Sequence, residues 1–534
     1  MNAYMIAVYV VCSAYMILNF KHDIQMFQQN SYRIPRYWRW LRHNMANTWR
    51  LTDIVCILLM CAVLLDYRMA AFLVALVCLA KTGLIFKKKY KKPLVFTRRV
   101  WRLYTTTAVI SVGAVTAVAV YTGDPSTVYW GTYPAGAITV STILLLAVLS
   151  FIPLIIADII LIPVEKWINR RYINDARRIL RSMPDLTVVG ITGSYGKTST
   201  KHYLTRILSE EYDTLMTPGS YNTPMGVVRT IREMMKPYNQ IFVCEMGAKQ
   251  KGDIKEICDI VHPRIGIVTA VGPMHLESFK TLDNVCSTKF ELVDALPSGG
   301  VAMINNDFDQ CANREVSNVK AVRYGVTNTE HCGYRAVNVR YTPDGTTFTV
   351  EGPEGFSLDI ATRLLGECNV SDLLAAIVTA LHLGVAPEKI RYAVGAIEQV
   401  EHRLSIKRTP GNVTIIDDAF NSNPSGSKMA VDVLSRFDGA GKRIIVTPGM
   451  IELGSEQYNL NREFGRHIAG NVDIAIVVGA YNRDAITEGI REGGFNEKSL
   501  IMVDSFNEAQ QRLAGLLSAG DTVLYENDLP DTFK

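Results

Sequence analysis

The sequence predicts a helical membrane domain at the N-terminus, followed by two α/β domains with mainly parallel sheets. Three observations support this division. Hydrophobic residues make up 48% of the 534-residue chain, its mean hydropathy is +0.12, and the apolar excess lies mostly before residue 165. After that point short β-rich runs alternate with helical ones, which is typical of an α/β fold. We therefore expect domains at 1–165, 166–400 and 401–534.

Five apolar runs in the first domain are candidate transmembrane helices. They are residues 3–20, 51–65, 69–86, 104–121 and 135–163. A bilayer crossing requires about 20 apolar residues, and the second run is short. The segment 51–86 is therefore either a hairpin of two spans or one long tilted helix.

The distribution of Lys and Arg favours the hairpin. Residues 21–50 and 87–103 are rich in basic side chains, whereas 122–133 contain none. Basic loops prefer the cytoplasm, and both can lie there only if an even number of crossings separates them. Five spans with an external N-terminus satisfy this condition and predict a multi-pass protein of the cytoplasmic membrane whose later domains lie in the cytoplasm. The net charge of +5 therefore indicates membrane topology and not nucleic-acid binding.

A phosphate-binding loop opens the second domain. Residues 187–191 have the pattern of a short buried strand, 193–196 form a glycine-rich turn, and a helix begins near Lys197. The backbone N–H groups of such a turn and the helix N-terminus attract phosphate. Lys197 can then reach the β- and γ-phosphates, and the hydroxyl of Thr198 can bind Mg²⁺.

Three further segments place polar side chains near the ends of predicted strands or on a helix. Residues 241–245 form a buried strand that ends at Glu245, on the edge where α/β proteins bind ligands. Another strand runs into a loop that carries His275, and Lys289 lies on a helix predicted over 285–295. Each residue alone is more typical of a cap, a loop or a solvated surface, so the information lies in their order.

That order resembles the Mur ligase family, and in particular its MurF branch, which joins D-alanyl-D-alanine to a UDP-MurNAc peptide. The shared motifs are T-G-S-x-G-K-T-[ST] at 192–199, G-S-Y-N-T-P-x-G at 219–226, E-M-G-A at 245–248 and G-P-M-H-L-E at 272–277. The common G-x-x-x-x-G-K-[ST] pattern would require glycine at Ile191, so the loop is closer to the Mur form. The similarity continues through 364–369 into 415–424 and covers most of the chain after the membrane domain.

The resemblance implies a P-loop central domain, a Rossmann-like C-terminal domain, and ATP and Mg²⁺ as cofactors. Thr198 and Glu245 would hold one Mg²⁺, and His275 with a carbamylated Lys289 would hold a second. Carbamylation converts an ammonium, which repels Mg²⁺, into an oxygen ligand. The catalytic residues would be Lys197, His275, Lys289 and Arg403. The ATP-binding residues would be Gly193, Ser194, Gly196, Lys197, Thr198, Ser199, Asn369, Arg403, Asp418, Asn421 and Asn423.

The chain departs from the family pattern at three places. The H-N-x-x-N motif is reduced to Asn369 within residues 368–372, and Ala419 and Phe420 replace a Ser and a Tyr whose hydroxyls are lost. The third departure is the UDP-sugar-binding domain, for which the sequence offers only membrane spans and a short linker. Either the substrate is held differently, or it is not a soluble UDP-sugar.

We therefore expect an ATP-dependent ligase that forms an amide bond through an acyl phosphate. Its substrates would be a cell-wall peptide precursor, UDP-linked or lipid-linked, and an amino acid or dipeptide, joined at the cytoplasmic membrane face. The alternatives are a ligase for another envelope polymer such as a poly-amino-acid capsule, a non-catalytic membrane scaffold, and a transport ATPase. The scaffold is disfavoured because the expected catalytic residues are present, and the transporter because the spans contain few charges.

Two other cofactor classes are not expected. The strands predicted at 443–448, 473–478 and 522–526 alternate with helices but lack G-x-G-x-x-G, so a dinucleotide is not expected. The ten cysteines lack C-x-x-C spacing, and we interpret them as reduced packing thiols, not as zinc ligands.

Overall fold

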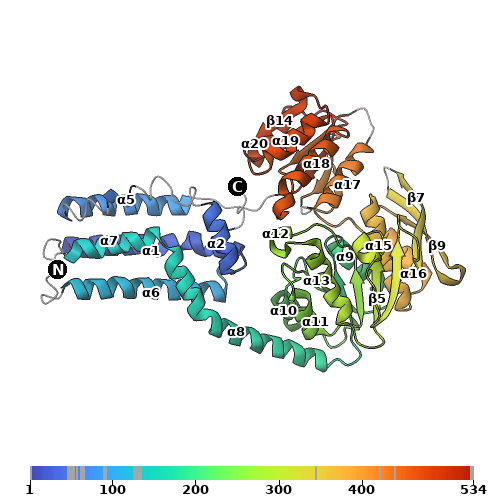
Figure 1. Ribbon diagram of the computed structural model, residues 1–534, viewed down its shortest axis with the longest axis horizontal. Helices are drawn as coiled ribbons and strands as arrows, with labels where there is room; N and C mark the ends of the chain where they lie inside the picture. Colours follow the sequence, from blue (N-terminus) through green and yellow to red (C-terminus); the bar gives the residue numbers. More distant parts are fainter. Residues whose placement is uncertain are drawn as a thin grey trace. The chain divides into compact units, whose positions relative to one another are not determined.

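The computed structural model describes residues 3–44, 67–87, 93–123, 135–342, 345–419, 423–437 and 441–528, with isolated residues between 55 and 59. The chain divides into two compact units, the first extending to Asn169 and the second covering Arg170–Leu529. Figure 1 shows the elements of both units.

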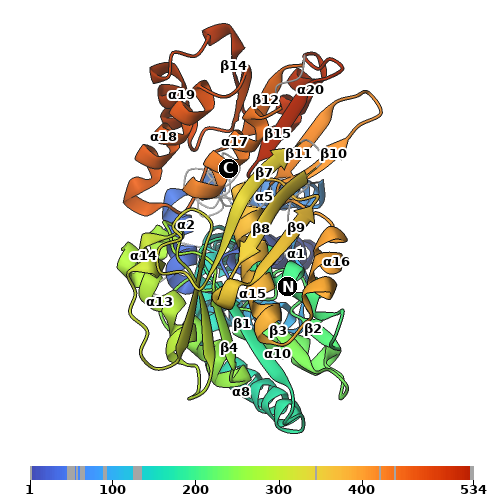
Figure 2. The ribbon, with the colours of Figure 1, turned by 90° about the vertical axis from the view of Figure 1, so that its right-hand side faces the viewer.

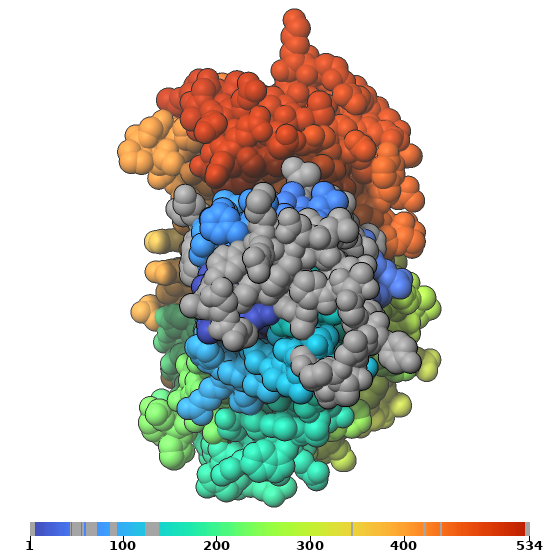
Figure 3. Space-filling model, turned by 90° about the vertical axis from the view of Figure 1, so that its left-hand side faces the viewer, coloured from blue at the N-terminus to red at the C-terminus, as the bar shows by residue number. Residues whose placement is uncertain are grey.

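The N-terminal unit is helical. Its helices are α1 (Ala3–Gln29), α2 (Ile34–His43), α5 (Tyr67–Lys87), α6 (Arg98–Gly123), α7 (Ala135–Val148) and the first part of α8 (Phe151–Arg181). The helices α1, α5, α6 and α7 run side by side around a core that includes Phe20, Cys78 and Ile143. Other apolar side chains, such as Val109 and Val120 at 70% exposure each, face outward. The described part of this unit is blue to cyan in the space-filling view (Figure 3).

The structure supports fewer membrane spans than the five predicted. By length and composition one helix among the described residues, Arg98–Thr122, is apolar enough to cross a bilayer alone. The bent pair Ile138–Val148 and Phe151–Arg181 is long and apolar enough for a membrane span only when its two helices are taken together. Helices α1 and α5 cover the predicted runs 3–20 and 69–86 without meeting the criterion. The run 51–65 falls almost wholly outside the described residues.

The predicted span at 135–163 is not one straight helix, because two helices meet there at 72°. Pro153 explains the break: a proline is tolerated in the first turn of α8, but it cannot donate the hydrogen bond that a continuous helix would need. The predicted linker is also mostly helix, since α8 continues to Arg181. Its last turns are amphipathic, and Ala176, Ile179 and their neighbours pack into the core of the second unit.

The central domain, from β1 to α16, contains a nine-stranded sheet in the order β2-β3-β1-β4-β5-β6-β7-β8-β9. Its strands are β1 (Thr187–Thr192), β2 (Thr214–Met216), β3 (Ile241–Glu245), β4 (Ile265–Val268), β5 (Val301–Asn305), β6 (Lys320–Gly325), β7 (Tyr334–Thr342), β8 (Gly345–Glu351) and β9 (Ser357–Thr362). Pairing is parallel up to β7 and antiparallel beyond it. The chain order changes direction beside β1, and such switch points bind ligands.

Helices cover both faces of this sheet. On one face α9 (Lys197–Leu208), α15 (Glu367–His382) and α16 (Pro387–Gly395) enclose one apolar core. On the other, α8 packs with α10 (Pro224–Met234), α11 (Asp253–Val261) and α13 (Leu282–Asp294). The short elements are α12 (Leu276–Phe279), α14 (Asp309–Ala312) and η2 (Pro353–Gly355). The predicted strands at 187–191 and 241–245 and the helix at 285–295 are confirmed to within a few residues.

The C-terminal domain, from β10 to β15, contains a six-stranded sheet in the order β10-β11-β15-β12-β13-β14. Its elements are β10 (Ser405–Arg408), β11 (Thr414–Asp418), α17 (Pro424–Ser435), β12 (Arg443–Thr447), η3 (Gly454–Glu456), α18 (Gln457–Ala469), β13 (Ile474–Val478), α19 (Arg483–Glu492), η4 (Glu497–Ser499), β14 (Leu500–Val503), α20 (Phe506–Ala514) and β15 (Thr522–Glu526). Only β10 pairs antiparallel, so the Rossmann-like alternation is confirmed. Figure 2 shows both sheets.

Helices α18 and α19 cross closely at two glycines, Gly465 and Gly489. A Cβ atom on Gly489 would lie 1.9 Å from the carbonyl oxygen of Arg462. Alanine favours a helix interior over glycine by about 1 kcal/mol, but here the two backbones must separate to admit it.

We therefore expect Gly489→Ala to destabilise the C-terminal domain by about 1–3 kcal/mol, the usual cost of overpacking. Thermal unfolding of the full chain, followed by circular dichroism, measures the effect. Gly470→Ala is the matched control, because a Cβ atom there meets nothing within 4 Å. Equal midpoints for the two variants would contradict the close crossing.

Candidate active site

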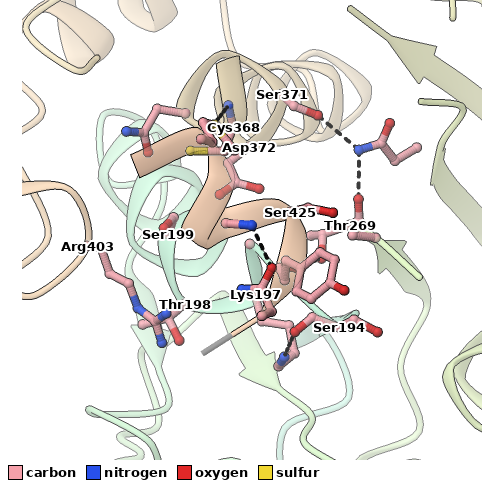
Figure 4. Close-up of a pocket in the computed structure, with 18 of the residues that line it drawn as sticks. Ser194, Lys197, Thr198, Ser199, Thr269, Cys368, Ser371, Asp372, Arg403 and Ser425 are labelled. Carbon is pink, nitrogen blue, oxygen red and sulfur yellow. Dashed lines mark hydrogen bonds between the residues drawn. The ribbon is translucent and has the colours of Figure 1, made fainter. Parts of the chain in front are cut away.

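A cavity lies at the carboxyl ends of β1 and β3, between the central and C-terminal domains (Figure 4). Ten of the predicted site residues line it: Ser194, Gly196, Lys197, Thr198, Ser199, Glu245, Asn369, Arg403, Asp418 and Asn423. Gly193, His275 and Lys289 do not line it. Asn421 lies outside the described residues. The structure therefore brings most of the predicted ATP-binding set together.

The phosphate loop has the predicted form. Gly196 has φ of +77°, and a Cβ atom there would lie 2.1 Å from an oxygen of Asp372, so only glycine fits. The ammonium of Lys197 donates to the carbonyls of Gly193 at 2.6 Å and Ser194 at 3.2 Å. Burial lowers the pKa of Lys197 to about 8, with Glu245 opposing this shift and Arg403 adding to it.

Thr198 and Glu245 meet as the sequence predicts. The Thr198 hydroxyl lies 3.2 Å from each carboxylate oxygen of Glu245, which is 1% exposed. Hydroxyl and carboxylate oxygens are the donors that Mg²⁺ prefers, and the remaining ligands are usually phosphates and water. This donor set therefore fits a magnesium ion bound together with a nucleotide.

Lys201 is a site residue that the sequence analysis missed. Its side chain is fully buried, and its ammonium donates to Glu245 at 2.9 Å and to the carbonyl of Gly219 at 2.7 Å. Burial raises the pKa of Glu245, but Lys201 and Lys197 outweigh it and hold that pKa below its usual value. The available signal was spacing: Lys201 follows Thr198 by three residues, which places both on one face of α9.

Asp372 is a second missed residue, at a position where the family pattern has asparagine. It lines the cavity beside Gly196 and receives a hydrogen bond from Thr200 at 3.2 Å. Burial raises the pKa of Asp372 to about 8, against the hydrogen bond from Thr200 and the charge of Arg403. At neutral pH the side chain keeps its proton, so it offers one donor and one acceptor, as an asparagine amide does.

Asn369 and Asn423 have structural partners in addition to their place in the cavity. The amide of Asn369 accepts from the Tyr203 hydroxyl and donates to the carbonyl of Leu365, both at 2.7 Å. Asn423 caps α17, accepting from the N–H of Gly426 at 2.7 Å. These contacts account for both residue types without a nucleotide.

Arg403 and Asp418 bring the C-terminal domain to the cavity. Asp418 is buried at the end of β11, where it accepts from the N–H of Leu404 at 3.2 Å. Arg403 enters the cavity beside Thr198 in Figure 4, and its charge acts on both Lys197 and Asp372. The structure thus shows the two domains closed around the phosphate loop.

His275 and Lys289 lie next to this cavity. His275 begins α12, and its Nδ1 atom is hydrogen bonded to Glu452 of the C-terminal domain. Lys289 is 2% exposed, and within the described ranges its ammonium has no hydrogen bond or ion pair. Burial, and then the charge of Lys197, hold the pKa of Lys289 well below its usual value.

Among the residues that the structure describes, no three His, Cys, Asp or Glu side chains cluster as a complete metal site.

Comparison with known proteins identifies the family. The family described as "Mur ligase middle domain" matches residues 191–380, and the one described as "Mur ligase, glutamate ligase domain" matches residues 402–525. The UDP-N-acetylmuramoyl-tripeptide–D-alanyl-D-alanine ligase of Escherichia coli (strain K12) is 30% identical over 345 residues, which are 64% of this chain and 75% of that protein. The chain belongs to the Mur ligase family. It is an ATP-dependent enzyme that forms amide bonds.

Other Mur ligases agree with this assignment. The UDP-N-acetylmuramoyl-tripeptide–D-alanyl-D-alanine ligase of Bacillus subtilis (strain 168) is 29% identical over 64% of this chain and 72% of its own. A crystal structure of MurF from Acinetobacter baumannii matches with a TM-score of 0.61 at 27% identity, covering 68% of this chain and 78% of that one. The MurF ligase of Thermotoga maritima in complex with ADP matches with a TM-score of 0.59 at 25% identity, covering 67% of this chain and 80% of that one.

We expect nucleotide binding to take up a proton at pH 8.5. The free enzyme holds Lys197 at a pKa of about 8, so the amine is mostly neutral at that pH, and bound phosphate favours its charged form. Below pH 7 the lysine is already protonated and the uptake disappears. Calorimetry of ADP binding in two buffers with different ionisation enthalpies measures the protons bound.

Two variants assign this proton. Lys197→Arg stays charged at every pH and should bind ADP without taking up a proton. Asp372→Asn removes the other group with a pKa near 8 and should retain most of the proton uptake. Unchanged uptake in Lys197→Arg would show that the proton belongs elsewhere.

Proposed function

We propose that this chain is a MurF-like ligase that joins a dipeptide such as D-alanyl-D-alanine to a muramyl peptide precursor at the cytoplasmic face of the membrane. One observation carries the proposal. Lys197, Thr198 and Glu245 of the central domain share one cavity with Arg403 and Asp418 of the C-terminal domain. The relatives named above supply the substrate class. A non-catalytic scaffold has no need for this convergence of charged groups.

The reaction proceeds in two steps. A substrate carboxylate attacks the γ-phosphate of ATP, so that an acyl phosphate forms and ADP leaves. The amine of the dipeptide then attacks the acyl carbon, the amide bond forms, and phosphate and a proton leave. Bound Mg²⁺, held by Thr198 and Glu245, would neutralise negative charge on the transferring phosphoryl group.

The side chains of the cavity contribute mainly through charge and position. Lys197 binds the phosphates, and the N–H groups of residues 193–196 orient them. Lys201 keeps Glu245 ionised and in place. Arg403 adds positive charge from the opposite domain, and the closed cavity protects the acyl phosphate from water.

A second Mg²⁺ is proposed between His275 and a carbamylated Lys289. Support comes from the burial of Lys289, its lack of an ionic partner in the described structure, and the charge interaction that places it near both His275 and Lys197. A carbamate on the Lys289 amine would supply an oxygen ligand, which neither His275 nor an unmodified lysine provides.

We further propose that the N-terminal unit binds the bilayer and presents the ligase to a lipid-linked or membrane-delivered precursor. The apolar helix Arg98–Thr122 supports this, as do the outward-facing apolar side chains of α6 and the basic residues concentrated in 21–50 and 87–103. A membrane-confined substrate would then meet the active site at a raised local concentration.

We expect the full-length protein in lipid nanodiscs to release phosphate from ATP only when both a muramyl tripeptide and D-alanyl-D-alanine are present. Lys197→Ala should lower this turnover by about 100-fold or more, because an electrostatic partner of the transferring group is lost. The comparison of UDP-linked with lipid-linked tripeptide tests the membrane proposal. Turnover without peptide, or an active Lys197→Ala, would contradict the ligase assignment.

We expect Lys289→Ala to be inactive and to regain part of its activity with added short-chain carboxylates, which replace the missing oxygen ligand. Carbon-13 NMR after exposure to ¹³CO₂ should show a carbamate signal in the wild type that Lys289→Ala lacks. Lys251→Ala, at an exposed lysine of the same domain, is the control. An active, signal-free Lys289→Ala beside a signal-free wild type would refute carbamylation.

A further inference from the structure

Tyr195 is the one large side chain of the phosphate loop, and it lies between Ser194 and Gly196 in the sequence. Its ring packs against the ring of Phe308, with the two centroids 6.2 Å apart and the planes at 56°. The hydroxyl of Thr269 donates to the backbone carbonyl of Tyr195. Both aromatic residues line the cavity. This packing explains an aromatic ring at position 195 but not its hydroxyl.

The Tyr195 hydroxyl reaches the loop that follows β4. It donates to the carbonyl of Pro273 at 3.2 Å, and a Cβ atom on Gly272 would lie 2.5 Å from it, so this approach requires glycine. Ser194 is bonded to the same segment, since its hydroxyl donates to the carbonyl of Gly272 at 3.0 Å and accepts from the N–H of Gly272 at 3.1 Å. Residues 272–273 are therefore fitted to the phosphate loop.

The second partner of the Tyr195 hydroxyl comes from the C-terminal domain. Ser425 is the second residue of α17, and it lines the cavity with Lys197 and Ser194 (Figure 4). Burial raises the pKa of Tyr195, and a hydrogen bond with Ser425 opposes this rise. A hydrogen bond that favours the ionised phenol is one in which the phenol oxygen accepts, so Ser425 is the donor. The hydroxyl of Tyr195 thus donates to one domain and accepts from the other.

The first turn of α17 is well defined where it makes this contact. Asn423 caps the helix by accepting from the N–H of Gly426 at 2.7 Å, and Pro424 occupies the first helical position. The backbone of a proline at that position is already in helical geometry. Ser425 is therefore presented by a preorganised turn, and little conformational entropy is lost when its hydroxyl meets Tyr195.

We propose that Tyr195 is a positioning residue for the ligase reaction: its hydroxyl links the phosphate loop to α17, so that the C-terminal domain closes directly on the loop that binds the phosphates. The inference needs only the ATP-dependent activity of the family and not the particular substrates proposed above. Because Ser194 and Gly196 flank the tyrosine, the shape that the loop takes around phosphate decides whether the hydroxyl can meet Ser425. Domain closure thus depends on a correctly formed phosphate loop.

Two backbone N–H groups report domain closure without turnover. The N–H of Glu277 donates to the carbonyl of Glu452 at 3.2 Å. The N–H of Cys368 donates to Sδ of Met429 at 3.2 Å, also across the domain boundary. Each N–H belongs to the first turn of its helix, where it has no acceptor within the helix itself. The hydrogen exchange of both groups therefore becomes faster when the two domains separate.

Hydrogen exchange of the full chain, followed by mass spectrometry, tests the proposal. Both N–H groups should exchange about 5-fold faster in Tyr195→Phe than in the wild type, because one hydrogen bond that favours closure is lost. Ser425→Ala should have the same effect and leaves the contact with Pro273 in place. Tyr324→Phe is the matched control, since its buried hydroxyl makes no hydrogen bond with the described residues, and it should exchange like the wild type. Wild-type exchange in Tyr195→Phe and Ser425→Ala would overturn the proposal.

The double variant Tyr195→Phe/Ser425→Ala distinguishes a direct link from two separate losses. It should exchange no faster than either single variant, because the two hydroxyls act as one unit. Additive increases in exchange would overturn the link between them.

Binding and turnover separate positioning from a merely structural role. Tyr195→Phe should keep the wild-type dissociation constant for ADP, because the central domain holds the phosphates, whereas its kcat should fall and its KM for ATP should not change. Weakened ADP binding with wild-type exchange would show that the hydroxyl only shapes the phosphate loop. A wild type that forms no amide from a muramyl peptide would refute the proposed substrates and leave the exchange test intact.

Discussion

The architecture of the active site depends on one buried carboxylate. Glu245 lies at the end of a fully buried strand, where an isolated charge would cost several kcal/mol in lost hydration. The protein compensates with Lys201 and the Asn222 amide, each at 2.9 Å, and with the Thr198 hydroxyl. These partners come from α9 and from the loop before α10. Satisfying Glu245 therefore fixes the phosphate-loop helix and that loop against β3.

Burial shifts the pKa values of two oppositely charged groups in the cavity around this carboxylate. Lys197 and Asp372 both have pKa values of about 8, one lowered and one raised by burial. Near neutral pH both therefore carry a proton, and Arg403 adds a further positive charge. A polyanion such as ATP meets the positive charges of Lys197 and Arg403 there, and the protonated carboxyl of Asp372 adds no negative charge beside the phosphate loop. This explains how an aspartate is tolerated where the family pattern has an asparagine.

Local patterns in the sequence were sufficient to predict the phosphate loop, Glu245 and the alternation of strands and helices. In each case a buried run and the residue that ends it are adjacent in the chain. Lys201, Asp372 and Glu452 were missed because their roles depend on contacts between distant segments: Glu452 lies 177 residues from the histidine it contacts. Before residue 165, apolar composition alone could not show where a helix bends, as it does between α7 and α8. The role of Asn423 could not be decided from the sequence either, because a nucleotide contact and a helix cap favour the same residue type.

The hydrogen bonds from Lys197 to the carbonyls of Gly193 and Ser194 have a consequence for nucleotide affinity. They hold the phosphate loop in a folded shape that a positive φ at Gly196 alone would not secure. The amide groups are then arranged before any phosphate arrives, so the entropy lost in ordering them is part of folding and does not weaken binding. Nucleotide entry exchanges one acceptor of the Lys197 ammonium for another. The loop therefore acts as a preorganised anion receptor whose selectivity comes from its shape.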